Sequence, residues 1–235
     1  MYSFDSRVRY SELAENGKLS PDGIVNYLQD CTCFESEELG VGMDTVYGRQ
    51  KMWVLNFWQI VIDRYPDMGE HIKIATQACG SEKMFGYRNF LIYGEDGKAA
   101  IQAYSIWTLL DRVKMRPCMV SPEDIDQYGI ADPLPLEKVS RKISVPNEGG
   151  QEQKAFVVQE YHLDTNHHVN NGQYVRMATA YLPETFVIRE LRVEYRSQAM
   201  LGDTIRPVRY EMPDGYLVAL QDSAGKAYCV VRFMG

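Results

Sequence analysis

The chain has 235 residues, of which 45% are hydrophobic and 24% charged, and its formal net charge is −7. This composition predicts a globular protein with a full core and excludes disordered and fibrous classes, and the acidic charge argues against a general nucleic-acid binder. No apolar run approaches the roughly 18–20 residues that span a bilayer, and the N-terminus lacks the apolar stretch of a signal peptide. We therefore expect a cytoplasmic protein without membrane attachment.

The first half predicts one helix followed by strands. Ser20 is a typical N-cap, and Pro21 occupies the first helical position. Apolar residues then recur at helical spacing at Ile24, Tyr27, Leu28 and Cys31,. A β-rich run follows at 53–62, and Asp96-Gly97 predicts a hairpin turn,.

The second half repeats this order at an offset of about 130 residues, found by searching for internal repeats. A helix is predicted from Tyr174 to Leu182, ending at Pro183, and a strand over 186–195. The acidic turn Gly69-Glu70 has its counterpart in Gly202-Asp203, and the Asp96-Gly97 hairpin has its counterpart in a second predicted hairpin turn at Ala224-Gly225,. We therefore expect an α+β fold in which two antiparallel sheets each carry one long helix.

The domain limits follow from the repeat. We expect a first domain over 1–125, a second over 154–235, and a polar linker at 126–153,. The five cysteines are odd in number and lack zinc-ligand spacing, which predicts free thiols in a reducing compartment,. Neither a metal nor a cofactor is predicted.

Three of the four histidines lie within seven residues, directly before the second helix. If this segment is extended, Asp164, Asn166 and His168 point to one side and His167 to the other. An imidazole can take a proton from water, a carboxylate can orient it, and an amide can hold a water or a carbonyl. The helix N-terminus offers backbone N–H groups to an oxyanion.

Simpler interpretations of the same segment remain open. Asn170 and Asn171 are favoured as helix caps. His162 and His167 are favoured as structural or surface residues.

The segment Asp164–Asn171, followed by a helix, resembles the active-site signature of the acyl-acyl-carrier-protein (acyl-ACP) thioesterases. Further segments are similar to that family over nearly the whole chain: Ile24–Gln29, Trp53–Pro66, Ala103–Trp107 and Leu191–Ser197. The resemblance implies a tandem hotdog fold and hydrolysis of fatty acyl-ACP thioesters to free fatty acids.

The resemblance also implies residue roles. Asp164 would orient His168 or the water, Asn166 would bind the carbonyl or the water, and His168 would transfer the proton. The family often has Glu then Cys where this chain has Gln198 and Ala199. Neither can act as base or nucleophile, so Gln198 is expected only to position water. Glu194, on the same face by alternation, is a weaker candidate.

The first domain would hold the acyl chain under its helix, with one active site per chain. Its expected lining is Leu39, Val41, Met43, Met52, Trp53, Leu55 and Phe57. The acidic carrier protein would dock on a basic cluster, either Arg112, Lys114 and Arg116 or Arg189, Arg192 and Arg196. Both a monomer and a homodimer are compatible with the sequence.

Three other functions are kept as alternatives. The same site could serve a hotdog acyl-coenzyme A thioesterase, or a dehydratase or hydratase of acyl thioesters. The Gln198-Ala199 pair is also compatible with a non-catalytic acyl-binding protein.

Overall fold

The computed structural model describes residues 1–42 and 50–235. The chain forms two compact units, Met1–Val139 and Ser140–Gly235. Their boundary falls inside the segment 126–153 that was expected to link two domains. Met43, one of the expected acyl-lining residues, lies outside the described residues.

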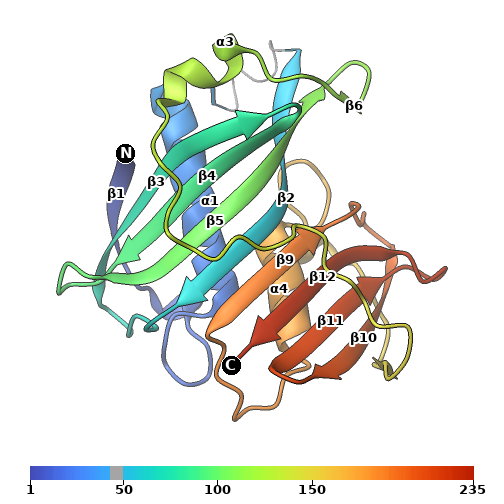
Figure 1. Cartoon of the computed structure of the whole chain (residues 1–235). Coiled ribbons are helices and arrows are strands. Elements are labelled where there is room, and N and C mark those ends of the chain that lie inside the picture. Colours follow the sequence, from blue (N-terminus) through green and yellow to red (C-terminus); the bar gives the residue numbers. More distant parts are fainter. Residues whose placement is uncertain (43–49) are drawn as a thin grey trace. The chain divides into compact units, whose positions relative to one another are not determined.

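The first unit is an antiparallel sheet with one long helix, α1 (Pro21–Glu38), lying across one face (Figure 1). The strand order is β1-β3-β4-β5-β2, and a short strand β6 pairs with β5. The strands are β1 (Tyr2–Arg7), β2 (Lys51–Ile62), β3 (His71–Glu82), β4 (Phe85–Tyr93), β5 (Ala99–Asp111) and β6 (Arg116–Pro117). Short helical segments lie at η1 (Tyr10–Glu12), α3 (Pro122–Ile125) and η2 (Asp126–Tyr128).

Helix α1 begins where the sequence predicts. The Ser20 hydroxyl accepts a hydrogen bond from the backbone N–H of Gly23 at 3.1 Å, which satisfies one of the free donors of the first turn,. Ile24, Leu28 and Cys31 are fully buried toward the sheet. The predicted helix and its cap are therefore confirmed.

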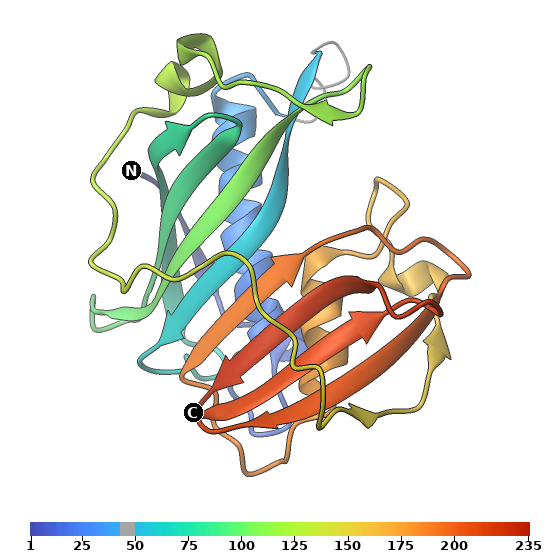
Figure 2. The same cartoon turned by 45° about the vertical axis from the view of Figure 1, so that its right-hand side comes forward.

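The second unit repeats this arrangement with a shorter helix, α4 (Asn171–Thr179), lying on the face of its sheet (Figure 2). The strand order is β9-β12-β11-β10-β7, and β8 also pairs with β10. The strands are β7 (Gln151–Glu152), β8 (Phe156–Val157), β9 (Glu190–Tyr195), β10 (Thr204–Met212), β11 (Gly215–Gln221) and β12 (Ala227–Met234), and η3 (Glu160–His162) precedes α4.

Two predicted boundaries in the second unit are wrong. Helix α4 ends at Thr179 rather than before Pro183, because the backbone N–H groups of Tyr181 and Leu182 bond three residues back and tighten the chain into turns,. Strand β9 starts at Glu190 rather than at Phe186. Phe186 instead packs edge-on against the ring of Tyr216, with centroids 5.0 Å apart.

Both predicted hairpin turns are confirmed. Gly97 and Gly225 adopt φ values of +73° and +83°, a region that side chains other than glycine rarely enter,. In each turn the glycine N–H bonds three residues back, to Gly94 and Asp222. Among the described residues, no helix is both long and apolar enough to cross a membrane.

Candidate active site

The histidine-rich segment of the second unit folds into a tight turn. The backbone N–H of Asp164 donates to the carbonyl of His168 at 2.9 Å, and that of His167 donates to the carbonyl of Asp164 at 3.0 Å. Leu163 and Val169 form an antiparallel bridge at the base of the turn. The segment is therefore a small hairpin that begins after η3 and ends at α4.

The expectation that this segment is extended is wrong. Alternation along a strand cannot explain the grouping of its side chains, because the chain reverses between Asp164 and His168. The reversal needs a left-handed residue, and His167 supplies it with φ = +64°,. A turn forms here instead of an extended strand because Asp and Asn side chains hydrogen-bond to nearby backbone groups and thereby favour turns.

The turn still brings Asp164 and His168 together. Nδ1 of His168 lies 3.4 Å from Oδ2 of Asp164, and the two side chains are 21% and 18% exposed. This separation is slightly longer than an ordinary hydrogen bond. Since Nδ1 faces the carboxylate, the other ring nitrogen, Nε2, is the atom left for proton transfer. The pair is sheltered yet reachable from solvent.

Asn166 lies at the tip of the turn and is exposed. Its backbone N–H donates to Oδ1 of Asp164 at 2.8 Å, which leaves Oδ2 of that carboxylate directed at His168. The two carboxylate oxygens of Asp164 therefore make different contacts: Oδ1 stabilises the turn, and Oδ2 faces the imidazole.

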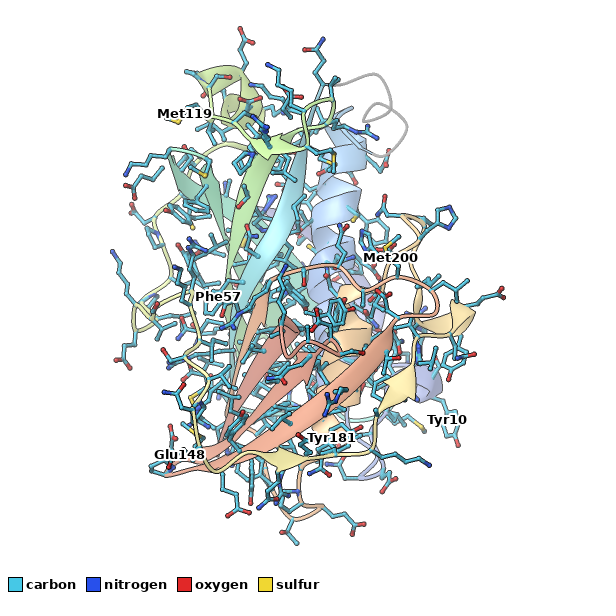
Figure 3. All side chains as sticks on the ribbon, turned by 90° about the vertical axis from the view of Figure 1, so that its right-hand side faces the viewer. Tyr10, Phe57, Met119, Glu148, Tyr181 and Met200 are labelled. Carbon is cyan, nitrogen blue, oxygen red and sulfur yellow. The ribbon has the colours of Figure 1, made fainter. Side chains whose placement is uncertain are left out.

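A loop after β9 supports this turn from one side. The backbone N–H of Val169 donates to the carbonyl of Ala199 at 2.9 Å, and His168 bridges to Met200, which Figure 3 labels on the surface. The N–H of fully buried Ala199 in turn donates to the Tyr174 hydroxyl of α4 at 2.9 Å. Tyr174 thereby connects the helix, the loop and the histidine.

Sequence reasoning missed this role of Tyr174. Its apolar helical spacing indicated only a core position, and the ring is indeed 3% exposed. Nothing in a local pattern shows where a hydroxyl at the end of a core ring will meet a loop from a distant part of the chain.

Gln198 lies in the same loop and is exposed. It stands two residues from Met200, the bridge partner of His168. The expectation that Glu194 shares a strand face with it is wrong, because β9 ends at Tyr195. Glu194 is buried, accepts a hydrogen bond from the backbone N–H of Ile143 at 2.8 Å and pairs with Arg196 at 2.7 Å, so its contacts are structural.

The N-terminus of α4 is capped by its own residues. The Asn170 side chain accepts from the N–H of Gly172 at 2.8 Å, and the Asn170 carbonyl accepts from Gln173 at 3.0 Å. The cap prediction for Asn170 is confirmed. Because these two N–H groups are occupied within the helix, an oxyanion would have to be stabilised mainly by other donors.

His162 is a structural residue, as favoured from the sequence. It is 8% exposed, and its Nδ1 accepts a hydrogen bond from the backbone N–H of Gln159 at 3.0 Å. Burial lowers the pKa of His162, so the ring is neutral near pH 7, in keeping with an acceptor at Nδ1,.

The first unit has the same turn without the carboxylate and the imidazole. Ala14 and Lys18 take the places of Asp164 and His168, because the N–H of Ala14 donates to the Lys18 carbonyl at 2.9 Å and Leu13 bridges to Leu19. Gly17 supplies the left-handed position with φ = +77°. This turn cannot perform acid–base chemistry with a carboxylate and an imidazole.

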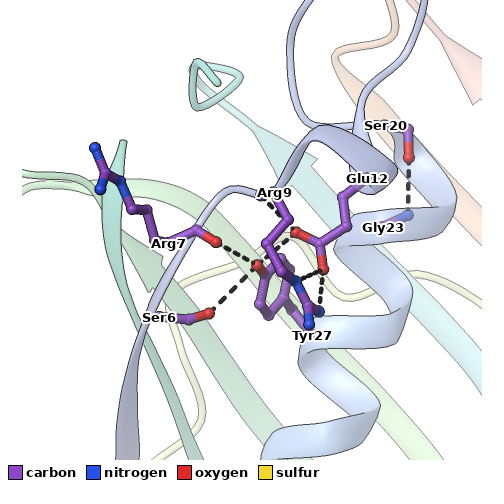
Figure 4. A network of polar contacts seen from close by, with 7 residues as sticks. All are labelled: Ser6, Arg7, Arg9, Glu12, Ser20, Gly23 and Tyr27. Atoms are coloured by element: carbon purple, nitrogen blue, oxygen red, sulfur yellow. Dashed lines mark hydrogen bonds and ion pairs between the residues drawn. The ribbon is translucent and has the colours of Figure 1, made fainter. Parts of the chain in front are cut away.

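A polar network joins the segment before this turn to helix α1 (Figure 4). The Glu12 carboxylate accepts from the backbone N–H and the guanidinium of Arg9, and from the Tyr27 hydroxyl at 2.6 Å. Although burial opposes it, these hydrogen bonds from Arg9 and Tyr27 lower the pKa of Glu12. Glu12 accepts the same backbone hydrogen bond that His162 accepts in the second unit.

Models of known protein families match a large part of each unit. The acyl-ACP thioesterase N-terminal domain matches residues 1–128, and the acyl-ACP thioesterase C-terminal domain matches residues 147–227. The chain belongs to the acyl-ACP thioesterase family. This acyl-ACP thioesterase homologue carries the Asp164–His168 turn inside the part matched by the C-terminal domain model.

Curated proteins of similar sequence are named as members of the same family. A chloroplastic palmitoyl-acyl carrier protein thioesterase of Gossypium hirsutum is 25% identical over 84% of this chain and 52% of its own length. The chain therefore spans about half the length of the curated relatives it matches.

Solved structures confirm the tandem hotdog fold. An acyl-ACP thioesterase from Bacteroides thetaiotaomicron aligns with a TM-score of 0.89 at 23% identity, covering 99% of this chain and 96% of that one. The 12:0-ACP thioesterase from Umbellularia californica aligns with a TM-score of 0.85 at 18% identity, covering 100% of this chain and 97% of that one.

Proposed function

We propose that this protein hydrolyses fatty acyl-ACP thioesters to free fatty acids, using the turn of the second unit as its catalytic site. The observation that carries the proposal is the 3.4 Å approach of Asp164 to Nδ1 of His168 at a partly exposed position. A carboxylate on one ring nitrogen holds the imidazole with the other nitrogen free to accept a proton. The family and the relatives named above supply the substrate class.

In the proposed step, Nε2 of His168 removes a proton from a water while the water oxygen forms a bond to the thioester carbonyl carbon. The tetrahedral intermediate then collapses, the carbon–sulfur bond breaks, and the proton passes from the imidazolium to the departing sulfur. The products are a carboxylic acid and the carrier thiol. Positioned acid–base help of this kind contributes roughly 10²–10⁴-fold in rate.

Asn166 and Gln198 are proposed to act by hydrogen bonding. The Asn166 side chain is exposed at the tip of the turn, where an amide N–H can reach a carbonyl oxygen of a bound thioester,. Gln198 is proposed to position the water from the neighbouring loop. Because Ala199 carries no nucleophilic atom, attack by water rather than by the enzyme is the mechanism proposed.

The proposed partner is the acyl carrier protein itself. In the second-unit cluster Arg189 lies exposed at the surface, Arg192 pairs with Glu190 at 2.6 Å, and Arg196 pairs with Glu194 at 2.7 Å. These ion pairs reduce the net positive charge that the second-unit cluster offers to an acidic partner. Charge reversal at Arg189 together with Arg192 is expected to raise KM for the acyl-ACP substrate.

The test is steady-state hydrolysis of matched acyl-ACP and acyl-coenzyme A substrates by the wild type, His168→Ala and Lys18→Ala. Lys18 occupies the equivalent turn position in the first unit, which makes its variant a matched control. We expect acyl-ACP to be cleaved faster, His168→Ala to lose at least ~10²-fold in kcat, and Lys18→Ala to match the wild type.

Three other outcomes of this assay would contradict parts of the proposal. Faster cleavage of the coenzyme A substrates would assign the same site to an acyl-coenzyme A thioesterase. A folded His168→Ala variant with wild-type activity would remove the histidine from the mechanism. No cleavage of either substrate would favour acyl binding without catalysis.

A further inference from the structure

Residues 200–203 of the second unit form a tight turn directly beside the turn that carries His168. The backbone N–H of Asp203 donates to the Met200 carbonyl at 3.0 Å, and Gly202 takes the left-handed conformation with φ = +85°. Met200 is also the residue that forms an antiparallel bridge with His168. The placement of the histidine backbone therefore depends on how this second turn is held.

Apolar packing contributes little to holding this turn. Met200 and Leu201 are 44% and 55% exposed, although both side chains are large and apolar. The backbone attaches the turn to the chain before η3, because the N–H of Gly202 donates to the Val158 carbonyl at 3.1 Å and the N–H of Val158 donates to the Asp203 carbonyl at 2.9 Å. Since side chains that face solvent bury little apolar surface, hydrogen bonds are the main interactions that fix this turn.

The Asp203 carboxylate adds a side-chain hydrogen bond that closes the turn. Its Oδ2 accepts from the backbone N–H of Met200 at 2.8 Å and from the Tyr228 hydroxyl on β12 at 3.3 Å. The backbone of Tyr228 is itself fixed, because its carbonyl accepts from the N–H groups of Arg196 and Ser197 at 2.8 and 3.1 Å. One carboxylate oxygen thus connects β12 to the residue that bridges the histidine.

The first unit contains the same contact beside its own turn. The backbone N–H of Asp67 donates to Oε2 of Glu70 at 3.0 Å, and Asp67 forms the antiparallel bridge with Lys18. The Arg64 guanidinium holds this carboxylate in addition, with hydrogen bonds of 2.8 and 2.6 Å. Glu70 therefore makes the same backbone contact as Asp203, but the residue bridged beside it is a lysine instead of a histidine.

We infer that Asp203, oriented by the Tyr228 hydroxyl, is a positioning residue for His168 in the hydrolytic step. This inference rests on the proposed thioesterase function. Without the carboxylate, the N–H of Met200 loses its acceptor and the bridge to the histidine backbone loosens. The imidazole then loses its alignment with Asp164 and with the attacking water, and proton transfer slows because it needs geometry accurate to about 0.5 Å.

The test compares Asp203→Ala, Asp203→Asn and Glu70→Ala by acyl-ACP hydrolysis and by thermal melting. We expect kcat of Asp203→Ala to fall about tenfold while KM stays within about twofold, because misplacement of the imidazole slows proton transfer without removing a substrate contact. Asp203→Asn keeps an oxygen acceptor for the N–H of Met200, so its kcat should lie within about threefold of the wild type. Glu70→Ala loses the equivalent bond and an ion pair as well, so its melting temperature should fall at least as far while kcat stays at the wild-type value.

Amide hydrogen exchange measures the same contact without turnover. The N–H of Val169, which bonds to the loop after β9, should exchange faster in Asp203→Ala than in the wild type,. The N–H of Leu19, which makes the equivalent bond in the first unit, should exchange faster only in Glu70→Ala. If the wild type hydrolyses neither substrate, the proposed function fails, and amide exchange still shows whether Asp203 holds the turn.

Wild-type kcat in a folded Asp203→Ala variant overturns the inference. An equal loss of kcat in Glu70→Ala also overturns it, because both losses would then follow from lower stability alone, and so does a failure of Asp203→Asn to recover activity. If Asp203→Ala does not fold, Tyr228→Phe takes its place, since the ring remains and only the hydroxyl that contacts Asp203 is lost. Faster exchange at Val169 in that variant supports the inference, and an exchange rate equal to that of the wild type overturns it.

Discussion

Nδ1 of His168 lies 3.4 Å from Oδ2 of Asp164 because a four-residue reversal folds the chain back between them. The same reversal in the first unit places Lys18 beside Ala14. The same backbone turn therefore appears in both units, and of these two turns only that of the second unit carries a carboxylate beside an imidazole.

Asp164→Asn tests the carboxylate without breaking the turn. The asparagine oxygen can still accept from the N–H of Asn166, but its neutral amide would not stabilise the imidazolium that the proposed mechanism forms on His168,. We expect kcat to fall by roughly 10²-fold with little change in KM or in melting temperature. Stopped-flow or steady-state thiol release measures this. Full activity in the variant would mean that the carboxylate serves the turn alone.

Tyr174→Phe tests the connection between α4 and the loop. The variant leaves the fully buried N–H of Ala199 without its acceptor, which costs about 1–3 kcal/mol in the free energy of unfolding,. Because this loop holds Val169 and bridges to His168, kcat should fall as well. Urea unfolding and hydrolysis assays check the two effects.

Tyr195→Phe is the matched control for that experiment. Its hydroxyl donates at 3.0 Å to the Asn171 carbonyl, which is only half-buried and can bind water instead. A loss below about 1 kcal/mol is expected. Equal losses in the two variants would argue against a special role for Tyr174.

The left-handed residues of the two turns give a reciprocal pair of predictions. His167→Gly should raise the free energy of unfolding by about 0.5–1 kcal/mol, since glycine relieves the cost of φ = +64°,. Gly17→Ala should lower it by about 1 kcal/mol, although nothing lies within 4 Å of the added Cβ,. Thermal melts measure both changes. Hydrolysis by His167→Gly should equal that of the wild type, because His167 is exposed.

Glu70 gives a pH-dependent prediction. Its hydrogen bond from Arg64 lowers the pKa of Glu70 to about 2, below the ordinary 4.5. A carboxyl group with a lowered pKa stabilises the fold above the ordinary value, and this stabilisation is lost as the pH falls from about 5 toward 2. Screening at this partly exposed pair reduces the effect to about 1–2 kcal/mol. In Glu70→Gln, the free energy of unfolding should depend less on pH over that range. If its slope against pH stayed as in the wild type, the stabilisation would not come from Glu70.

Local patterns were enough to predict much of the fold. The Ser20-Pro21 cap, the helical spacing of the apolar residues after it, and the glycines of the two hairpins all act within a few residues. Such interactions depend on backbone conformation and capping, which neighbours in sequence decide. The tandem α+β organisation followed from the repetition of these patterns in both halves.

The meeting of Asp164 with His168 required the turn, and the support from Tyr174 and the Ala199 loop required tertiary packing. The same is true of the contact between Asp203 and Tyr228, which lie in the loop after β9 and on β12 and meet only when the second sheet forms. The sequence by itself determined the residue types and the local turns. Only the tertiary structure decided which polar groups meet, because a buried hydrogen bond between distant segments depends on how whole elements pack.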